Sequence, residues 1–365
     1  MKFRVAADLN LLRERRAVLA LLVRPMAQTD LPLVFVICGQ SNVAGKGEPS
    51  DITTDERTRI AAVAGRVQVI VPEPVPPIDD PRLSSGVFTL LQRSAAPCMI
   101  GPDVFFGLQM AEQWPEQRIV LLKRCMLGTS LHGSWNVQWD QARALESDAP
   151  QFVGSIGLYE TLLRDLEALG PAQLRGVLWL QGERDVQIGG NAADAFHANL
   201  LALIRALRRD TGVPLLPFAL VAVSTRDYRE APVDFVHSEA GRDSPKGKVV
   251  RAMEEVSRSE DAVYFVSDGY GDVSSADYIP RGEDGTHFDT EGQRRLGARF
   301  AEIMLRVVDP EICAVNSVSL TWIDCVTHTP VSRHIFEHRR VKREGETKTG
   351  LPPPQISRHP KSTCV

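Results

Sequence analysis

Long apolar runs and an excess of charge of one sign are both missing from this 365-residue chain. No run approaches the roughly 20 apolar residues that a membrane-spanning helix needs, so no membrane span is predicted. The formal net charge of −4 gives no electrostatic reason to expect nucleic acid or an anionic membrane as the main partner. With an ordinary apolar share of 43%, the chain is long enough for one large globular domain or two small ones.

Metal-ligand and disulfide patterns are also absent. The six cysteines form no CxxC pair, and no cluster of Cys and His has the spacing of zinc ligands, so no metal site is expected. Cys38 and Cys125 lie in or beside apolar runs, which is typical of reduced cysteines in a core.

The two ends of the chain differ from its middle. Residues 1–30 carry arginines ahead of the apolar run 17–23, which indicates a signal segment, an amphipathic helix or a disordered leader. Because Arg24-Pro25 interrupts that run, a cytoplasmic location is favoured over secretion. Residues 310–365 lose their periodicity and become basic and Pro-rich, which predicts a disordered tail.

Between these ends, short apolar runs predict the buried strands of a parallel sheet, apolar on both faces. There are five such runs, at 33–38, 119–122, 176–180, 215–222 and 262–266. Pro217 weakens the start of the fourth run, since proline cannot donate to a strand ladder. One more short strand is compatible with residues 67–71, inside a Pro-, Asp- and Ser-rich excursion over 46–100.

Helical patterns alternate with these strands. Helices are predicted over 105–114, 159–169, 192–210 and 290–307. Asp103 is a candidate N-cap for the first, and Thr290 to Gln293 has the pattern of a capping box for the last. The alternation predicts an α/β fold: a three-layer αβα domain over residues 31–309, with a mostly parallel five-stranded sheet.

Unusual polar residues follow four of the predicted strands. They occupy residues 39–45, 127–135, 181–185 and 284–287. In an open α/β sheet, reacting groups gather just past the carboxyl ends of the strands, so these four segments are expected to meet in one place.

Three residues of these segments match the groups of a serine hydrolase. Ser41 lies at a Gly-rich strand-to-helix turn that can present its Oγ. His287 can act as the general base that a serine needs, and Asp284 can orient the imidazole. Asp289 is a rival for Asp284, and Asp268 is a weaker one.

An acyl transfer also needs hydrogen-bond donors aimed at the developing oxyanion. The candidates are the backbone N–H groups of Ser41 and Gly128 and the side-chain amide of Gln181.

These blocks resemble the SGNH-hydrolase superfamily, and within it the branch of sialate O-acetylesterases and family 6-like carbohydrate esterases. The matching residues are Gly39 to Asn42 with Ala44-Gly45, Gly101-Pro102 with Phe106-Gly107, Lys123, Gly128 to Ser130 with Trp135, Gln181 to Glu183 with Asp185, and Asp284, Gly285 and His287 with Gly292. They occur in family order and are spread over residues 33–305.

The resemblance implies a flavodoxin-like αβα fold with no metal or organic cofactor. It implies a triad of Ser41, His287 and Asp284 that hydrolyses small acyl esters, above all O-acetyl groups on carbohydrates. An acetylated carbohydrate or another small ester is then the partner. The oxyanion and substrate-binding residues that it implies are Gly128, Gln181, Gln40, Asn42, Glu183 and Trp135.

Two residues depart from the family pattern. Leu127 stands where the family usually has a second glycine, and its Cβ is expected to alter the oxyanion loop. Arg184 stands where a small residue is usual, and it is expected to point into solvent or to pair with Asp185.

Some interpretations stay open at the level of sequence. Trp135 and Trp139 are candidates for a platform that stacks on a sugar, with core packing as the alternative. Two other functions compete with the esterase: a catalytically impaired carbohydrate-binding protein on the same fold, and a lipid or thioester hydrolase.

Overall fold

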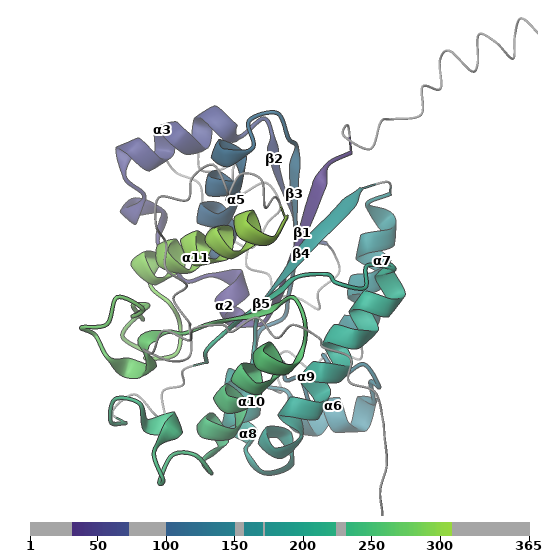
Figure 1. Cartoon of the computed structure of the whole chain (residues 1–365), viewed down its shortest axis with the longest axis vertical. Coiled ribbons are helices and arrows are strands. Elements are labelled where there is room, and N and C mark those ends of the chain that lie inside the picture. Colours follow the sequence, from purple (N-terminus) through teal and green to yellow (C-terminus); the bar gives the residue numbers. More distant parts are fainter. Residues whose placement is uncertain (1–30, 73–99, 150–156, 171, 224–230, 309–365) are drawn as a thin grey trace, which may run out of the picture.

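The structure is a computed structural model that describes residues 31–72, 100–149, 157–170, 172–223 and 231–308 (Figure 1). The expectations for the leader (1–30), the tail (310–365) and most of the excursion after the first strand fall outside these residues.

The described core is built on one parallel sheet of six strands in the order β2-β3-β1-β4-β5-β6 (Figure 1). Their bounds are β1 Leu33–Gly39, β2 Val67–Ile70, β3 Ile119–Cys125, β4 Gln173–Leu180, β5 Phe218–Val221 and β6 Val263–Val266. Without the edge strand β2, the order is that of a flavodoxin-like sheet. The α/β prediction is therefore confirmed.

The predicted count of five strands was one short. Strand β2 is only four residues long, and full burial alternates with exposure along it, as an edge position allows. Such a short alternating segment gives a weaker signal than β1, where all seven residues are buried.

Charged residues obscure the second half of β3 in the sequence. The apolar run stops at Leu122, yet the strand continues through Lys123 and Arg124 to Cys125. Both charges are buried and paired: Lys123 Nζ lies 2.8 Å from Asp103, and Arg124 Nε donates to Asp165 at 2.6 Å. Pairing makes the burial of such groups tolerable.

Helices cover both faces of the sheet (Figure 1). On one face, α3 (Thr54–Val63), α5 (Pro102–Gln113) and α11 (Thr290–Val308) share a core with side chains of β1 such as Phe35. On the other, α7 (Leu158–Ala168), α9 (Gly190–Thr211) and α10 (Pro245–Ser259) share a core with the next residue, Val36. Alternate residues of β1 thus serve two separate cores.

Shorter helices complete the described part of the chain. They are α2 (Ser41–Ala44), α6 (Gln141–Ser147) and α8 (Glu183–Ile188), with 3₁₀ turns at Pro49–Asp51, Phe235–His237 and Gly269–Gly271. Helices α2 and α8 each begin within three residues of a strand's carboxyl end, which places them at the edge where polar segments were expected to meet.

Two capping predictions need correction. Gly101 is the N-cap of α5, and Asp103 instead uses its carboxylate to pair with Lys123. Helix α11 begins at Thr290 as predicted, but Asp289 accepts the Gly292 N–H at 2.7 Å, which leaves the Thr290 hydroxyl for other contacts.

Two longer helices, α3 and α10, were not predicted. Helix α3 begins with a complete capping box between Thr53 and Glu56. Helix α10 begins after Ser244, whose side chain accepts the Gly247 N–H, and its first residue is Pro245. Both start signals stand in the sequence and would have identified these helices.

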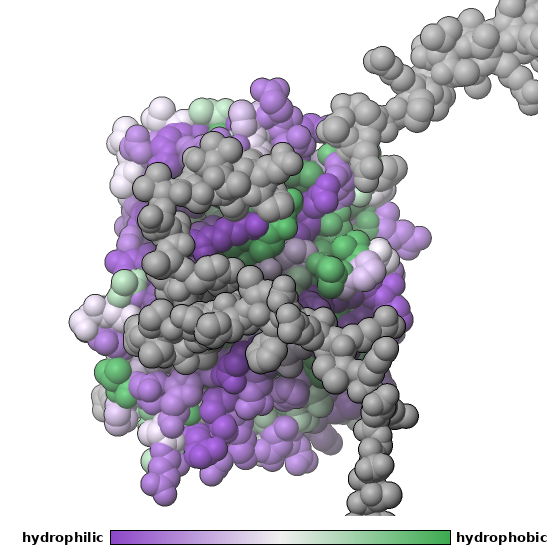
Figure 2. Space-filling model, viewed as in Figure 1, coloured by the Kyte–Doolittle hydropathy of each residue, from purple (hydrophilic) through white to green (hydrophobic). Residues whose placement is uncertain are grey.

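The described surface carries both hydrophilic and hydrophobic side chains. In the view of Figure 2, hydrophilic side chains cover most of the lower part of the face. Exposed large hydrophobic side chains come from different helices and loops: Leu145, Ile188, Leu215, Val233 and Val273. Among the described helices, none has the length and apolar character needed to cross a membrane.

Candidate active site

A tight turn after β1 presents Ser41. Gly39 ends the strand with a φ of +145°, and a Cβ at this position would lie 2.0 Å from the Leu180 carbonyl oxygen. Glycine is therefore required where β1 and β4 approach each other. The next residue, Gln40, donates its backbone N–H to the same Leu180 oxygen at 3.1 Å, and Ser41 then opens helix α2.

The structure brings Ser41, His287 and Asp284 together in one chain of hydrogen bonds. His287 Nε2 lies 2.7 Å from Ser41 Oγ, and His287 Nδ1 lies 2.6 Å from Asp284 Oδ2. The serine side is largely buried, whereas the Asp284 side chain is 51% exposed. This is the arrangement in which an imidazole can take the hydroxyl proton while a carboxylate fixes its tautomer.

The environment of Asp284 keeps its carboxylate ionised. Burial raises its pKa, but backbone and side-chain hydrogen bonds from His287, with the Thr286 N–H, outweigh burial and bring the pKa down to about 2. The His287 and Thr286 N–H groups donate to Oδ1 at 2.8 and 2.9 Å, which leaves Oδ2 for the imidazole. The loop backbone thus occupies one carboxylate oxygen of Asp284 and leaves the other for His287.

The rival carboxylates have other partners. Asp289 caps helix α11 through the Gly292 N–H, and Asp268 accepts a hydrogen bond from Arg281 at 3.0 Å. Of the three aspartates considered, Asp284 is the one that the structure places on the imidazole.

The buried carboxylate of Glu183 holds the residues on both sides of Ser41. Glu183 accepts the side-chain amide of Gln40 at 2.6 Å and that of Asn42 at 2.7 Å. Asn42 in turn accepts the Phe288 N–H at 3.1 Å, next to His287 in the chain. Gln40, Asn42 and Glu183 are each at most 3% exposed, so they are placed to orient the site's backbone and lie behind the reacting surface.

Burial raises the pKa of Glu183, and the hydrogen bond from Asn42 and the positive charge of Arg281 act against that rise. A carboxylate that accepts two amide donors costs much less to bury than an unpaired one.

The loop after β3 carries Gly128, whose φ of +66° favours glycine. Leu127 is not among the described residues with a positive φ, so its backbone needs no glycine. The expectation that the Leu127 Cβ alters this loop relative to the family pattern stays a prediction. The side chain packs at the edge of the core that holds α5 and α11.

Gln181 differs from its predicted role. Its side chain is fully buried, and its Nε2 donates to Asp185 at 2.5 Å and to the Thr129 carbonyl at 3.2 Å. Both N–H bonds of the amide are thus engaged inside the protein, and the side chain has no free donor for an oxyanion.

Trp135 also departs from its predicted role. Its side chain is 0% exposed and packs edge-on against Trp179, with ring centroids 5.2 Å apart. The core-packing alternative holds for this residue, and it cannot stack on a sugar. Trp139 is half-buried and packs against Gly157.

Arg184 was expected to face solvent or to pair with Asp185. It is half-buried and donates to the Ser147 carbonyl oxygen at 2.8 Å, while Asp185 is fully buried with other partners. Its guanidinium fastens the start of α8 to the end of α6.

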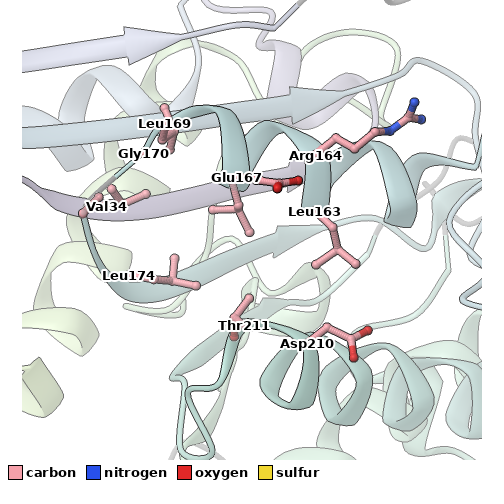
Figure 3. Close-up of a pocket in the computed structure, with 11 residues that line it drawn as sticks. Val34, Leu163, Arg164, Glu167, Leu169, Gly170, Leu174, Asp210 and Thr211 are labelled. Carbon is pink, nitrogen blue, oxygen red and sulfur yellow. The ribbon is translucent and has the colours of Figure 1, made fainter.

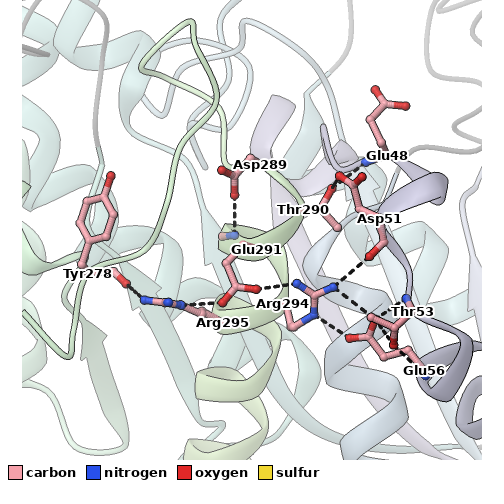
Figure 4. Close-up of polar contacts among 11 residues, drawn as sticks. Glu48, Asp51, Thr53, Glu56, Tyr278, Asp289, Thr290, Glu291, Arg294 and Arg295 are labelled. Carbon is pink, nitrogen blue, oxygen red and sulfur yellow. Dashed lines mark hydrogen bonds and ion pairs between the residues drawn. The ribbon is translucent and has the colours of Figure 1, made fainter. Parts of the chain in front are cut away.

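The described part of the excursion after β1 anchors the segment that follows His287 (Figure 4). The Thr290 hydroxyl donates to Asp51 at 2.6 Å and accepts the Glu48 N–H at 2.9 Å. Arg294, one turn further along α11, donates to Glu56 at 2.6 Å. These contacts fix the start of α11 on the same side of the molecule as the serine turn.

A cavity of about 230 Å³ lies against the loop that carries His287. Gly282 and Gly285 of that loop line it, together with the aromatic and charged side chains of Tyr270, Tyr278, Phe235, Lys246, Asp268 and Arg281.

A larger hollow of about 420 Å³ lies at the amino ends of the strands, between α7 and the end of α9 (Figure 3). Val34 and Leu174, at the starts of β1 and β4, line it. Ser41 follows the opposite end of β1, roughly 20 Å away at about 3.3 Å per residue. This hollow therefore lies too far away to hold an ester that reacts at Ser41.

Within the described ranges, no group of three or more His, Cys, Asp or Glu side chains is arranged to hold a metal ion. The sequence-based expectation of a metal-free and cofactor-free site stays a prediction. Cys38 and Cys125 are buried free thiols on adjacent strands, as expected, and burial raises the pKa of each.

The parallel sheet in this order, with polar residues gathered past the carboxyl ends of its strands, defines an α/β protein of the flavodoxin-like type with a candidate site at that end of the sheet. The chain belongs to the carbohydrate esterase family of sialic acid-specific acetylesterases, whose model matches residues 32–306. The family match confirms the resemblance seen in the sequence.

Three similar proteins are each less than 25% identical to this chain. A probable carbohydrate esterase of Arabidopsis thaliana is 24% identical over 217 residues, which is 55% of this chain and 74% of that protein. The solved structure of an Arabidopsis thaliana protein matches 76% of this chain and 99% of its own, with 20% identity and a TM-score of 0.49. A carbohydrate acetylesterase from Xanthomonas citri matches 75% of this chain and 56% of its own, with 16% identity and a TM-score of 0.49.

Proposed function

We propose that this carbohydrate esterase acts as a serine esterase that removes small acyl groups, above all O-acetyl groups from carbohydrates. The observation that carries the proposal is the hydrogen-bonded chain from Asp284 through His287 to Ser41, which joins residues 246 positions apart. The family to which the chain belongs supports the class of substrate.

In the proposed reaction, Ser41 Oγ attacks the ester carbonyl carbon while His287 Nε2 takes the hydroxyl proton over 2.7 Å. Asp284 stabilises the imidazolium that forms. The oxyanion is stabilised by the backbone N–H groups of Ser41 and Gly128, without the Gln181 amide. His287 then protonates the leaving alcohol, and water repeats the sequence on the acyl-serine to release the acid.

The cavity beside the His287 loop supports a carbohydrate as the alcohol part of the ester. Aromatic residues such as Tyr270 and Tyr278 line it together with charged residues such as Lys246 and Asp268, and this mixed lining suits a polyol better than an acyl chain. The lipid or thioester alternative lacks comparable support. The hollow lined by Val34 and Leu174 lies at the amino ends of the strands, opposite the end that Ser41 follows, so it cannot hold an acyl chain that reacts there.

The alternative of a catalytically impaired binding protein rests on Leu127 in the oxyanion loop and on the extended ends of the chain. The hydrogen bonds that join Ser41, His287 and Asp284 favour an active enzyme instead. We therefore expect the wild-type protein to turn over acetyl esters as well as to bind acetylated glycans.

The test is to replace Ser41 and measure hydrolysis of an activated acetyl ester, acetylated xylan and O-acetylated sialic acid. Ser41→Ala should lower kcat by about 10⁴-fold or more while the far-UV spectrum and Tm stay close to wild type. Ser259→Ala, an exposed serine near the end of α10, is the matched control and should keep full activity. Retention of activity by Ser41→Ala would refute the mechanism.

A further inference from the structure

The turn after β4 connects the two loops that flank the proposed reaction centre. This turn, Gln181 to Asp185, contains two fully or nearly buried carboxylates that are two positions apart. Glu183 fastens the serine turn by accepting the amides of Gln40 and Asn42. Asp185 points instead to the loop that follows β3.

Asp185 accepts three hydrogen bonds, two of them from the backbone of that loop. The Leu131 N–H donates to its Oδ2 at 2.9 Å and the His132 N–H to its Oδ1 at 3.0 Å. The third donor is the Gln181 amide, which also holds the Thr129 carbonyl oxygen. Backbone groups at three positions of the loop are thus connected to β4, the strand paired with β1.

We propose that Asp185 is a positioning residue that holds the segment Gly128 to His132 against the β4 turn and thereby aims the Gly128 N–H at the oxyanion formed on Ser41. The inference rests on the proposed function, because an oxyanion forms there only if Ser41 attacks an ester. Asp185 itself is fully buried and does not touch the substrate.

A second buried carboxylate, Asp148, also bonds this loop, but from a different side than Asp185. Asp148 accepts the Ser130 N–H at 2.7 Å and the Ser134 N–H at 3.1 Å, so it folds the loop on itself and onto the end of α6. That contact sets the shape of the loop. The bonds of Asp185 and Gln181 hold the middle of the loop to the turn after β4, while the Met126 N–H holds its start to the Gly39 carbonyl oxygen at 3.2 Å.

The charge state of Asp185 matters for this role. Burial, with a smaller effect of the nearby Asp148, outweighs the lowering effect of the hydrogen bonds from Gln181, Leu131 and His132 and raises the pKa of Asp185 to about 7. A carboxylate accepts at both oxygens, whereas the protonated acid carries a donor on one of them. As pH falls below about 7, one of the bonds to the loop is therefore lost.

Asp148 is the charged group that acts on Asp185 from the loop side. The contacts from His132 and Leu131 are backbone N–H groups, and Gln181 contributes a neutral amide from the end of β4. Where α10 packs against this turn at Gly182, it contributes the apolar side chains of Val249 and Met253.

The test is the steady-state kinetics of Asp185→Asn with an activated acetyl ester. The amide keeps the shape of the carboxylate but can accept at one oxygen only, so kcat per folded molecule should fall about 10–100-fold with KM nearly unchanged, as a misplaced oxyanion donor predicts. Asp210→Asn is the control, since Asp210 also accepts side-chain hydrogen bonds, from Tyr159 at 2.6 Å and Arg209 at 2.7 Å, but lines the hollow at the amino ends of the strands. It should keep the wild-type kcat.

Hydrogen exchange of the wild-type protein provides a readout that does not depend on the variant folding. Of the Leu131 and His132 amides, the one that donates to the protonated oxygen should lose protection about threefold or more between pH 8 and pH 6, after correction for intrinsic exchange. The Ala149 amide, which bonds to the Gly128 carbonyl oxygen, should keep its protection.

The outcomes separate the two proposals. A folded Asp185→Asn with wild-type kcat, or unchanged protection of Leu131 and His132 across this pH range, overturns the positioning role. If Ser41→Ala stays active, the proposed function fails and the positioning role fails with it. If Ser41→Ala is inactive and Asp185→Asn is not impaired, the positioning role alone is wrong.

Discussion

Among single residues, three carboxylates accept the hydrogen bonds that hold the loops of the site in place. Asp284 divides its two oxygens between the loop backbone and the His287 imidazole. Glu183 and Asp185 serve neighbouring loops in the same way. The sequence predicted that Ser41, His287 and Asp284 would meet, because four polar segments follow strands of one parallel sheet, and the structure places these three side chains in hydrogen-bonding contact.

The roles of Gln181 and Trp135 could not be predicted in this way. Both follow carboxyl ends of strands, where substrate contacts are expected, yet both are fully buried. Which side a residue faces depends on the layers that pack over it. Sequence position alone does not contain that information.

Asp284→Asn tests the aspartate through stability as well as activity. Because the folded pKa lies at about 2, below the usual 3.8, the carboxylate stabilises the fold above about pH 4 and loses that effect as pH falls toward 2. The variant should have a lower Tm than wild type at pH 7, with the difference shrinking as the pH falls from 4 to 2. Its kcat at pH 7 should fall by about 10⁴-fold. An equal Tm difference at both pH extremes would contradict the assignment.

Among the helices and strands, the buried pair of Lys123 and Asp103 joins β3 to α5 and also reaches the serine helix. Lys123 Nζ donates to the Ala44 carbonyl oxygen of α2 at 3.2 Å as well as to Asp103. The sequence-based prediction ended this strand at Leu122 because a lone charge is costly to bury, and the compensating partner lies 20 residues away.

Lys123→Met should destabilise the protein by about 3–5 kcal/mol, because it leaves Asp103 buried without its partner. Urea unfolding measures the change. Replacing both partners with apolar residues, as in Lys123→Met with Asp103→Leu, should recover much of the loss. Lys248→Met, which breaks an exposed pair with Asp194, is the control and should cost about 1 kcal/mol or less. Equal losses in the two single variants would show that the buried pair does not support β3.

A second contact between elements joins the 3₁₀ turn Phe235–His237 to α10. The His237 ring lies between Asp234 at 2.5 Å and Glu254 at 3.0 Å. Burial lowers the pKa of His237, but the hydrogen bonds and charges of these two carboxylates outweigh burial and raise it. The protonated ring therefore stabilises the fold at acid pH, and this effect is lost as pH rises through the raised pKa.

His237→Gln should lower the Tm by a few °C at pH 6 and by less at pH 9. Thermal unfolding followed by circular dichroism at both values measures the difference. His197→Gln on α9, which has no carboxylate partner among the described contacts, should show the same small change at both pH values. A larger effect of His237→Gln at pH 9 than at pH 6 would mean that the protonated ring does not stabilise the fold.

In the molecule as a whole, the parallel sheet explains how distant segments meet. Strand β1 lies between the parallel strands β3 and β4, so the residues that follow these three strands come together at the carboxyl end of the sheet without long connections. The alternation of strands and helices in the sequence predicted this convergence. It could not predict how the described part of the excursion after β1 anchors α11 through Thr290 and Arg294, because those contacts join segments more than 200 residues apart.

The proposed mechanism requires that the fold bring a hydroxyl near its start and an imidazole near its end together as one reactive unit. Peptide mapping by mass spectrometry after treatment with an activated phosphonate, which labels nucleophilic serines, measures this directly. We predict a single adduct on Ser41 that forms far more slowly in His287→Ala. An adduct on another residue, or labelling of His287→Ala at the wild-type rate, would contradict the mechanism.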